Sequence, residues 1–325
     1  MDALRLHSGC HPRIMLMRRL TFCALALLSL SACVADDAGA PSGAAPLAAA
    51  QDAAALQAWE QWKADENAAW STKEFAILKI DDAVYLNEGQ GAVLKPRADA
   101  RKSYRWEMGG KPRGAVLSIR HEGGKAVVVK GKKRETFSLD AMQRVNVAEG
   151  VDIRFGLTQV APGVNGLRVM VYNQAHPEAK AFKGLSHFPY DGRAVVEAKV
   201  ELAPSAEAVD FQTSRGWLKR INRVATASFT LYGKPVKLGL YSDDTDPKKV
   251  KRLSAFFHDE LSGGETYGVG RYLDVDVNGV PETMTIDFNR AYNPNCARSP
   301  HYNCPVAVEK IPVALRAGEM APPKH

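Results

Sequence analysis

Short runs of β-branched and aromatic residues recur through the chain from Phe75 onward. Gly, Asp and Asn separate these runs at the spacing of hairpin turns, and H-E-G-G at 121–124 is one such turn. The stretch 194–202 alternates well, as expected for a half-buried strand. Val195, Glu197, Lys199 and Glu201 face one way, and Val196, Ala198, Val200 and Leu202 face the other. The pattern predicts strands at 75–80, 83–86, 115–120, 125–130, 151–156, 166–172, 194–202, 227–232, 236–241, 272–277 and 282–288.

One segment before these strands has a helical period. Leu56, Trp59, Trp62 and Trp70 recur among Glu, Gln and Lys within 51–72, which predicts an amphipathic helix. We expect the tryptophans to dock this helix on the folded body. Placement in a membrane interface and a carbohydrate-binding stripe are the alternatives.

These elements predict the fold class. We expect a mainly β protein with one N-terminal helix followed by two packed antiparallel β units, each sandwich-like or barrel-like. The N-terminal β unit is expected to span 73–190 and the C-terminal β unit 191–325. Helical patterns are scarce after Phe75.

The first 50 residues predict export and lipid anchoring. Arg18 and Arg19 precede an apolar stretch, 20–30, that is too short to span a bilayer, so residues 1–32 are expected to be a signal peptide. Leu30-Ser31-Ala32-Cys33 fits a lipobox, with Cys33 as the lipidated residue. A plain signal peptide cleaved near Ala32 is the alternative.

Residues 33–50 are rich in Ala, Gly, Pro and Ser, so we expect a flexible tether behind the anchor. The expected location is the periplasmic face of the cell envelope. Val34, where an Asp would favour the inner membrane, favours an outer-membrane lipoprotein.

Charge adds little to this picture. The formal net charge of +7 includes four bases and one acid within residues 1–32, so the remainder of the chain carries +4. The basic run from Lys130 to Arg134 is short. Because one short run makes no continuous basic stripe, we interpret it as a solvated hairpin tip and expect no nucleic-acid partner.

Two polar, turn-rich stretches, 263–273 and 287–296, are the best candidates for a site. Turns of this composition hold polar side chains in fixed geometry on a rigid sheet. Arg271 and Arg290 are suited to clamp a carboxylate or phosphate, or to pair internally with Glu265 or Asp287. The candidate ligand-binding residues are Glu265, Tyr267, Arg271, Asp287, Asn289, Arg290 and Asn293.

Cys296 and Cys304 are the cysteines that follow the anchor. In an oxidising compartment they predict a disulfide that closes a Pro-containing loop. A Cys-His-Cys metal site with His301 is a minor alternative, and we expect no metal. A catalytic thiol is expected less still, because the second cysteine would quench it. His258 and His187 are candidates for a general base, although a lone histidine near a strand end is more often structural.

Cofactor and serine-hydrolase motifs are missing. Gly268 and Gly270 lack the third glycine of a dinucleotide loop, because Leu273 occupies its place, and no P-loop lysine follows. No Gly-x-Ser-x-Gly elbow is present. We therefore expect no cofactor.

The C-terminal motifs resemble a bacterial family. They read G-x-E-T-Y-G-x-G-R-Y-L, D-F-N-R-A-Y-N-P-x-C, C-P and, at 311–319, I-P-V-A-L-R-A-G-E. They are similar to those of the family known as domain of unknown function 1684. The resemblance extends upstream to W-K-A-D-E-N and to F-K-G-L-S-H-F-P at 182–189. This chain departs from the family at Asn295, where a second Pro is usual, and at E-F-A-I-L (74–78), where the family has G-W-L-x-L.

The resemblance implies an envelope β-protein of unestablished activity and supplies no catalytic residues. Our leading hypothesis is a ligand-binding or structural envelope lipoprotein whose partners are the membrane and a polar small molecule or envelope polymer. The first alternative is a hydrolase that acts on an envelope glycan or similar polymer through Glu265 and Asp287. The second is an assembly partner of other envelope proteins, which predicts an exposed apolar patch.

Overall fold

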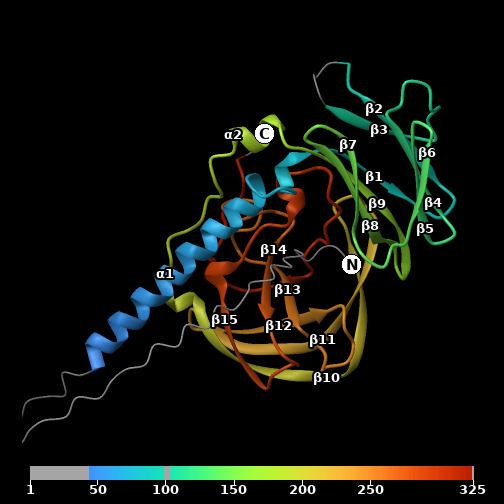
Figure 1. Ribbon diagram of the computed structural model, residues 1–325. Coiled ribbons are helices and arrows are strands. Elements are labelled where there is room, and N and C mark those ends of the chain that lie inside the picture. Colours follow the sequence, from blue (N-terminus) through green and yellow to red (C-terminus); the bar gives the residue numbers. More distant parts are fainter. Residues whose placement is uncertain (1–43, 99–102, 324–325) are drawn as a thin grey trace, which may run out of the picture.

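The computed structural model describes residues 44–98 and 103–323 (Figure 1). The expected signal peptide, Cys33 and most of the expected tether lie outside these residues. The described part is mainly β, with antiparallel sheets and one long N-terminal helix, which confirms the expected fold class. None of its helices is both long enough and apolar enough to cross a membrane.

Helix α1 spans Ala44–Ser71 and therefore begins seven residues before the expected Gln51. The expected tether is thus helical over its last residues. The physical reason is composition: alanine has the highest intrinsic helix propensity, and this stretch is rich in it. Pro46 falls in the first turn, where its missing N–H has no intrahelical partner to lose.

Helix α1 docks through its tryptophans. Trp59 and Trp70 are buried, and the indole Nε1 of Trp59 donates a hydrogen bond to the carbonyl oxygen of Asn289 at 3.0 Å. The ring of Trp62 packs edge-on against His187, with centroids 5.7 Å apart. These contacts confirm that the tryptophans face the folded body.

Two sheets form the N-terminal β unit (Figure 1, upper right). Their buried faces share one core. The first sheet has the order β1–β9–β8–β7: Ile80–Leu86, Val164–Asn173, Val151–Ala161 and Gln143–Ala148. The second has the order β3–β2–β4–β5–β6: Tyr104–Met108, Gly91–Pro96, Leu117–Glu122, Lys125–Lys130 and Lys133–Phe137.

Two carboxylates of β1 join the sheets at one edge. Asp81 accepts the amide N–H of Tyr104 at 3.0 Å, and Asp82 accepts the amide N–H of Trp106 at 2.7 Å. These amides lie on β3, an edge strand of the second sheet. The two carboxylates therefore accept hydrogen bonds from edge amides of β3 that could otherwise pair with another strand.

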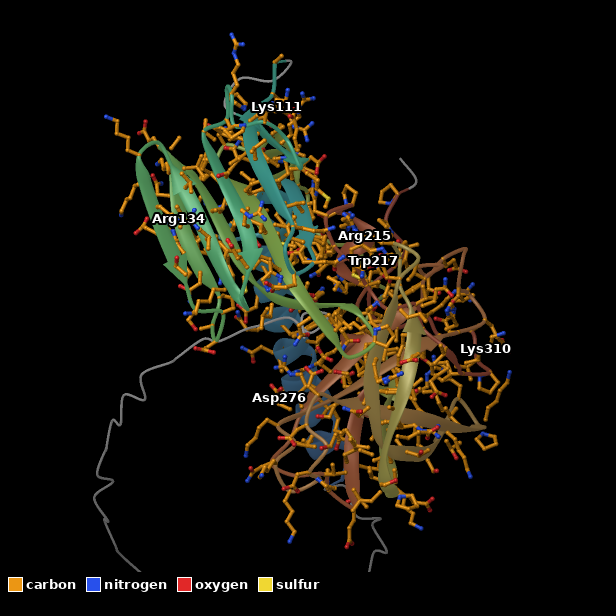
Figure 2. All side chains as sticks on the ribbon, turned by 90° about the vertical axis from the view of Figure 1, so that its right-hand side faces the viewer. Lys111, Arg134, Arg215, Trp217, Asp276 and Lys310 are labelled. Atoms are coloured by element: carbon orange, nitrogen blue, oxygen red, sulfur yellow. The ribbon has the colours of Figure 1, made fainter. Side chains whose placement is uncertain are left out.

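The basic run from Lys130 to Arg134 is a hairpin tip, as expected. Lys130 pairs with Lys133 where β5 turns into β6. Arg134 lies on the outer rim of the sandwich (Figure 2) and comes within 3.9 Å of Glu122. Acidic neighbours therefore interrupt the basic run.

The C-terminal β unit is a curved, nearly closed, barrel-like sheet (Figure 1). Backbone hydrogen bonds in both directions join Tyr272 of β14 to Tyr292, which follows β15 in the chain. A short helix, α2 (Pro177–Ala181), precedes the unit. The strand order is β14–β13–β12–β11–β10–β15: Arg271–Asp276, Arg252–His258, Lys234–Ser242, Leu218–Leu231, Val195–Gln212 and Thr283–Asp287; β16 (Glu309–Lys310) pairs in parallel with β13.

The C-terminal segment 311–317 contributes to the interior of this barrel. Its side chains alternate, with Ile311, Val313, Leu315 and Ala317 buried in the same core as the inward side chains of the strands. The barrel interior is therefore filled partly by the chain's own extended tail. Phe257 belongs to this core, whereas its neighbour Phe256 faces outward.

The outward face of the barrel carries an aromatic cluster that reaches the N-terminal unit. Phe256 and Tyr272 pack edge-on at 4.7 Å, and the same cluster includes Ile80 and Tyr172 of the first unit. At the junction, Tyr85 and Trp217 pack edge-on at 5.3 Å. Figure 2 shows Trp217 and Arg215 between the two units.

Candidate functional site

Arg271 lies at the start of β14 with its side chain inside the barrel, fully buried. Its Nη2 donates to Oδ2 of Asp259 at 2.8 Å and to the carbonyl of Leu315 at 3.0 Å. Its Nη1 donates to the carbonyl of Ala317. Burial lowers the pKa of the guanidinium, and the carboxylate of Asp259 opposes that shift. Arg271 thus holds the C-terminal segment inside the barrel.

The partner of Arg271 is therefore Asp259, and not Glu265 or Asp287 as considered from the sequence. Asp259 also accepts the amide of Leu261 at 2.8 Å and the hydroxyl of Thr266 at 3.1 Å. These bonds shape the turn that carries Gly263 to Thr266. Sequence reasoning missed Asp259, although its position directly after a buried strand was a usable signal.

Glu265 is on the surface. Arg316 donates to both of its carboxylate oxygens, from Nη2 at 2.7 Å and from Nε at 3.1 Å. The hydrogen bonds from Arg316 hold the pKa of Glu265 below its usual value. The carboxylate is thereby paired in a two-point contact with the tail segment.

Asp287, Asn289 and Arg290 do come together, in the short helix η3 (Phe288–Arg290) after β15. Asp287 accepts the amide and the side-chain N–H of Asn289, at 3.0 and 2.9 Å, and its Oδ2 lies 3.3 Å from Nε of Arg290. The side chain of Asn289 also bonds the backbone N–H and C=O of Asp191, each at 2.9 Å. This group ties η3 to the segment that leads into β10.

Asn293 is buried and binds Glu319 and Met320. Its amide donates to Oε2 of Glu319 at 2.8 Å, and its Nδ2 donates to the carbonyl of Met320 at 2.8 Å. Nε of Arg298 lies 3.8 Å from the other oxygen of Glu319. Glu319, which the sequence presented only as part of a motif, is therefore a fully buried carboxylate at the centre of these contacts.

The remaining candidate, Tyr267, lies beside the two cysteines. Burial and the neighbouring Cys296 raise the pKa of Tyr267 to about 12. Cys296 is partly exposed and Cys304 is buried, and both are free thiols in the structure. The amide N–H of Cys296 points to Sγ of Cys304 at 3.4 Å, so the two residues are in contact. The disulfide stays a prediction.

The histidines considered as general bases have structural surroundings. His258 Nε2 lies 3.1 Å from the carbonyl of Ala307, and burial lowers its pKa. His187 packs between the rings of Trp59 and Trp62. His301, considered only as a metal ligand, has its Nδ1 3.7 Å from Asp82. Within residues 44–98 and 103–323, no group of three or more His, Cys, Asp and Glu side chains is placed to hold a metal ion.

The two motifs thus meet the C-terminal segment at several places, and each predicted carboxylate has an arginine of its own. Residues 180–320 match the sequence model of the family described as protein of unknown function (DUF1684). This region of the chain belongs to the DUF1684 family. None of the curated proteins matches the chain.

Among solved structures, the chain is similar to the uncharacterized protein from gene locus rrnAC0354 of Haloarcula marismortui, determined by solution NMR. The identity is 34%, the match covers 46% of this chain and 83% of that one, and the TM-score is 0.39. The DUF1684 region of this chain contains the whole barrel, both polar stretches and the cysteine pair. Helix α1 and the N-terminal sandwich precede it.

Proposed function

We propose that this protein is a lipid-anchored module of the bacterial cell envelope that binds a ligand or holds structure, and that Glu265 and Asp287 do not catalyse hydrolysis. The signal segment and the lipobox at Cys33 support the anchor and the periplasmic face of the outer membrane as its place. Its partners in this proposal are the membrane, through the anchor, and a polar small molecule or envelope polymer.

One observation carries the proposal: Arg271, the fully buried arginine of the first motif, uses its guanidinium entirely inside the protein. It joins Asp259 to the carbonyls of Leu315 and Ala317 with no exposed surface. An arginine that binds a substrate keeps its N–H donors open to a cleft. Arg271 instead binds the C-terminal segment 311–317 inside the barrel. The polar motifs are therefore best explained as residues that stabilise the fold through internal hydrogen bonds.

The rival hydrolase has less support. Glycoside hydrolysis needs one carboxylic acid that is still protonated and a second carboxylate across the substrate. Arg316 lowers the pKa of Glu265, which makes it a poor proton donor near neutral pH. The carboxylate of Asp287 accepts hydrogen bonds from Asn289 and forms an ion pair with Arg290.

The assembly role also has less support. In the described part of the chain, the large hydrophobic side chains with high exposure lie on different elements: Leu56, Met108, Val164, Leu202, Leu218 and Val308. A docking patch requires several such side chains on one surface. A scattered set is ordinary for a protein surface.

The test compares the wild-type chain with the Glu265→Gln and Asp287→Asn variants. Each is incubated with envelope glycans and with chromogenic glycosides, and released product is measured. We expect wild-type product formation at the level of both variants and of the buffer blank. Turnover by the wild type that both substitutions abolish, with melting temperatures unchanged, would establish the hydrolase instead.

Binding is tested on the same material. The wild-type chain is titrated with soluble envelope glycan fragments while its melting temperature is followed. A saturable rise would support a binding module, and its absence would favour a purely structural role.

A further inference from the structure

Cys296 and Cys304 form an asymmetric pair. Cys296 lies in the short helix η4 (Asn295–Ala297) and is partly exposed, whereas Cys304 is buried in the aromatic cluster on the outside of the barrel. The amide of Cys296 donates to the sulfur of Cys304 at 3.4 Å. Cys296 is thus the more accessible of the two cysteines, and Cys304 is the shielded one in contact with it.

Two hydroxyl groups flank the exposed thiol. Ser214, on the turn between β10 and β11, accepts the amide of Cys304 at 3.1 Å and donates its own amide to the carbonyl of Cys304. Hydrogen bonds from Cys304, Ser214 and Tyr267 lower the pKa of Cys296 against the effect of burial. The pKa of Cys304 is raised well above its usual value, by its hydrogen bond with Cys296 and by burial.

Exposure combined with a shielded second thiol is the arrangement of a reacting and a resolving cysteine, because the thiolate is the attacking species and must reach its substrate. We propose that Cys296 and Cys304 form a thiol–disulfide exchange site, in which Cys296 attacks a disulfide substrate and Cys304 resolves the mixed disulfide. The proposal is independent of the proposed function and adds a chemical activity to the same domain.

The reaction balances with a disulfide as the oxidant. The Cys296 thiolate attacks one sulfur of the substrate disulfide, so a bond from Cys296 to that sulfur forms and the substrate's S–S bond breaks. The leaving thiolate takes up a proton. Cys304 then attacks Cys296, which closes the Cys296–Cys304 bond and releases the second substrate thiol. Two electrons and two protons pass from the cysteine pair to the substrate.

The loop between the cysteines connects the exchange site to the junction of the two β units. The hydroxyl of Tyr85 donates to the carbonyl of His301 at 2.9 Å, and Arg215 donates to the carbonyl of Pro300 at 2.7 Å. The folded loop is already held by these bonds, so closing the disulfide restricts mainly the unfolded chain. We therefore expect the oxidised form to melt at a higher temperature than the reduced form.

The test uses the full chain, reduced with dithiothreitol and freed of reductant. Brief treatment with iodoacetamide, followed by peptide mapping, reads each cysteine separately. We expect Cys296 to be alkylated at least about tenfold faster than Cys304, because it is the more exposed and more acidic thiol. With oxidised glutathione, the wild type should form the intramolecular disulfide and the Cys304→Ser variant should accumulate a glutathione adduct on Cys296.

Matched variants separate exchange from a merely structural disulfide. Cys296→Ser should leave Cys304 unmodified by oxidised glutathione in the folded protein. Tyr267→Phe, which removes one hydroxyl beside the sulfur, should slow alkylation of Cys296 severalfold near neutral pH and move its pH midpoint upward. Circular dichroism confirms that each variant is folded, and Cys→Ala replacements repeat the test if a serine variant is not.

Three results would overturn the proposal. Equal alkylation rates for the two cysteines would contradict the assignment of Cys296 as the attacking thiol and Cys304 as the resolving thiol. A wild type that stays a dithiol with oxidised glutathione would show that the pair does not exchange. A disulfide that forms but resists dithiothreitol in the folded protein would be a structural link only.

Discussion

The carboxylate of Asp259 and the guanidinium of Arg271 lie 2.8 Å apart, and both side chains are wholly shielded from solvent. Asp259 follows β13 and Arg271 begins β14, the neighbouring strand. Through Arg271 the pair also reaches the backbone of the C-terminal segment. This ion pair therefore connects β13, β14 and the C-terminal segment 311–317 inside the barrel.

Removing one member of this pair should destabilise the fold strongly. Arg271→Ala leaves Asp259 buried without its counter-charge, and breaking a buried pair in this way costs about 3–5 kcal/mol. We expect a fall of that size in the free energy of unfolding, measured by urea denaturation. Arg316→Ala is the matched control, because it removes the exposed arginine of Glu265 and should leave the midpoint unchanged. Equal effects of the two substitutions would contradict the fastening role.

Gly318 should tolerate a side chain far less than Gly233, although their φ angles are 79° and 78°. A Cβ at Gly233 meets nothing within 4 Å, so Gly233→Ala should cost only the left-handed backbone penalty of about 1–2 kcal/mol. At Gly318 the same atom would lie 2.6 Å from the carbonyl oxygen of Ala291. Overpacking adds about 1–3 kcal/mol there.

Chemical denaturation of the two alanine variants measures the difference directly. Both variants carry the same backbone penalty, because the two φ angles are nearly equal. The additional loss of unfolding free energy in Gly318→Ala therefore measures the cost of the steric clash at the C-terminal segment. Equal losses would show that the tail moves aside easily.

Acidification should destabilise the protein through His301. Burial lowers the pKa of His301 from its ordinary value of 6.5, although Asp82 opposes the shift and Arg215, Arg97 and His176 add to it. Between the folded-state pKa and 6.5 the unfolded chain binds more protons, so stability falls as the pH falls through this window. His301→Gln should flatten the dependence of the unfolding free energy on pH between about 7.5 and 5.5. An unchanged slope would mean that His301 does not titrate differently in the two states.

Membrane attachment should depend on one sulfur atom. Cys33→Ser removes the thiol that we propose accepts the diacylglycerol, so the variant should move from the membrane pellet to the soluble fraction after cell lysis. Immunoblotting of the two fractions measures this, with Cys296→Ser as the control that stays in the pellet. Membrane association that persists in Cys33→Ser would argue against the anchor.

Local patterns in the chain were enough to predict several elements. Alternation and turn residues predicted the β class and the hairpin tip at Lys130–Arg134, and the spaced tryptophans predicted the docked helix. The strand expected at 75–80 is wrong, because a short 3-10 helix forms at Ile77–Lys79 and β1 begins only at Ile80. Two further local predictions failed where backbone effects compete. Alanine propensity extended α1 to Ala44, and an irregular pairing between Leu202 and Glu207 left Leu202 exposed although its alternation places it with buried Val200.

The sequence by itself determined the period of each element and the presence of dense polar motifs, because propensity and hydrophobic patterning act between near neighbours. Only the tertiary structure decided which charges meet. Glu265 pairs with Arg316, 51 residues away, and Arg271 pairs with Asp259 and not with either of the carboxylates inside the motifs. The choice follows from barrel closure, which brings the tail against β13 and β14 and buries one arginine while leaving another exposed.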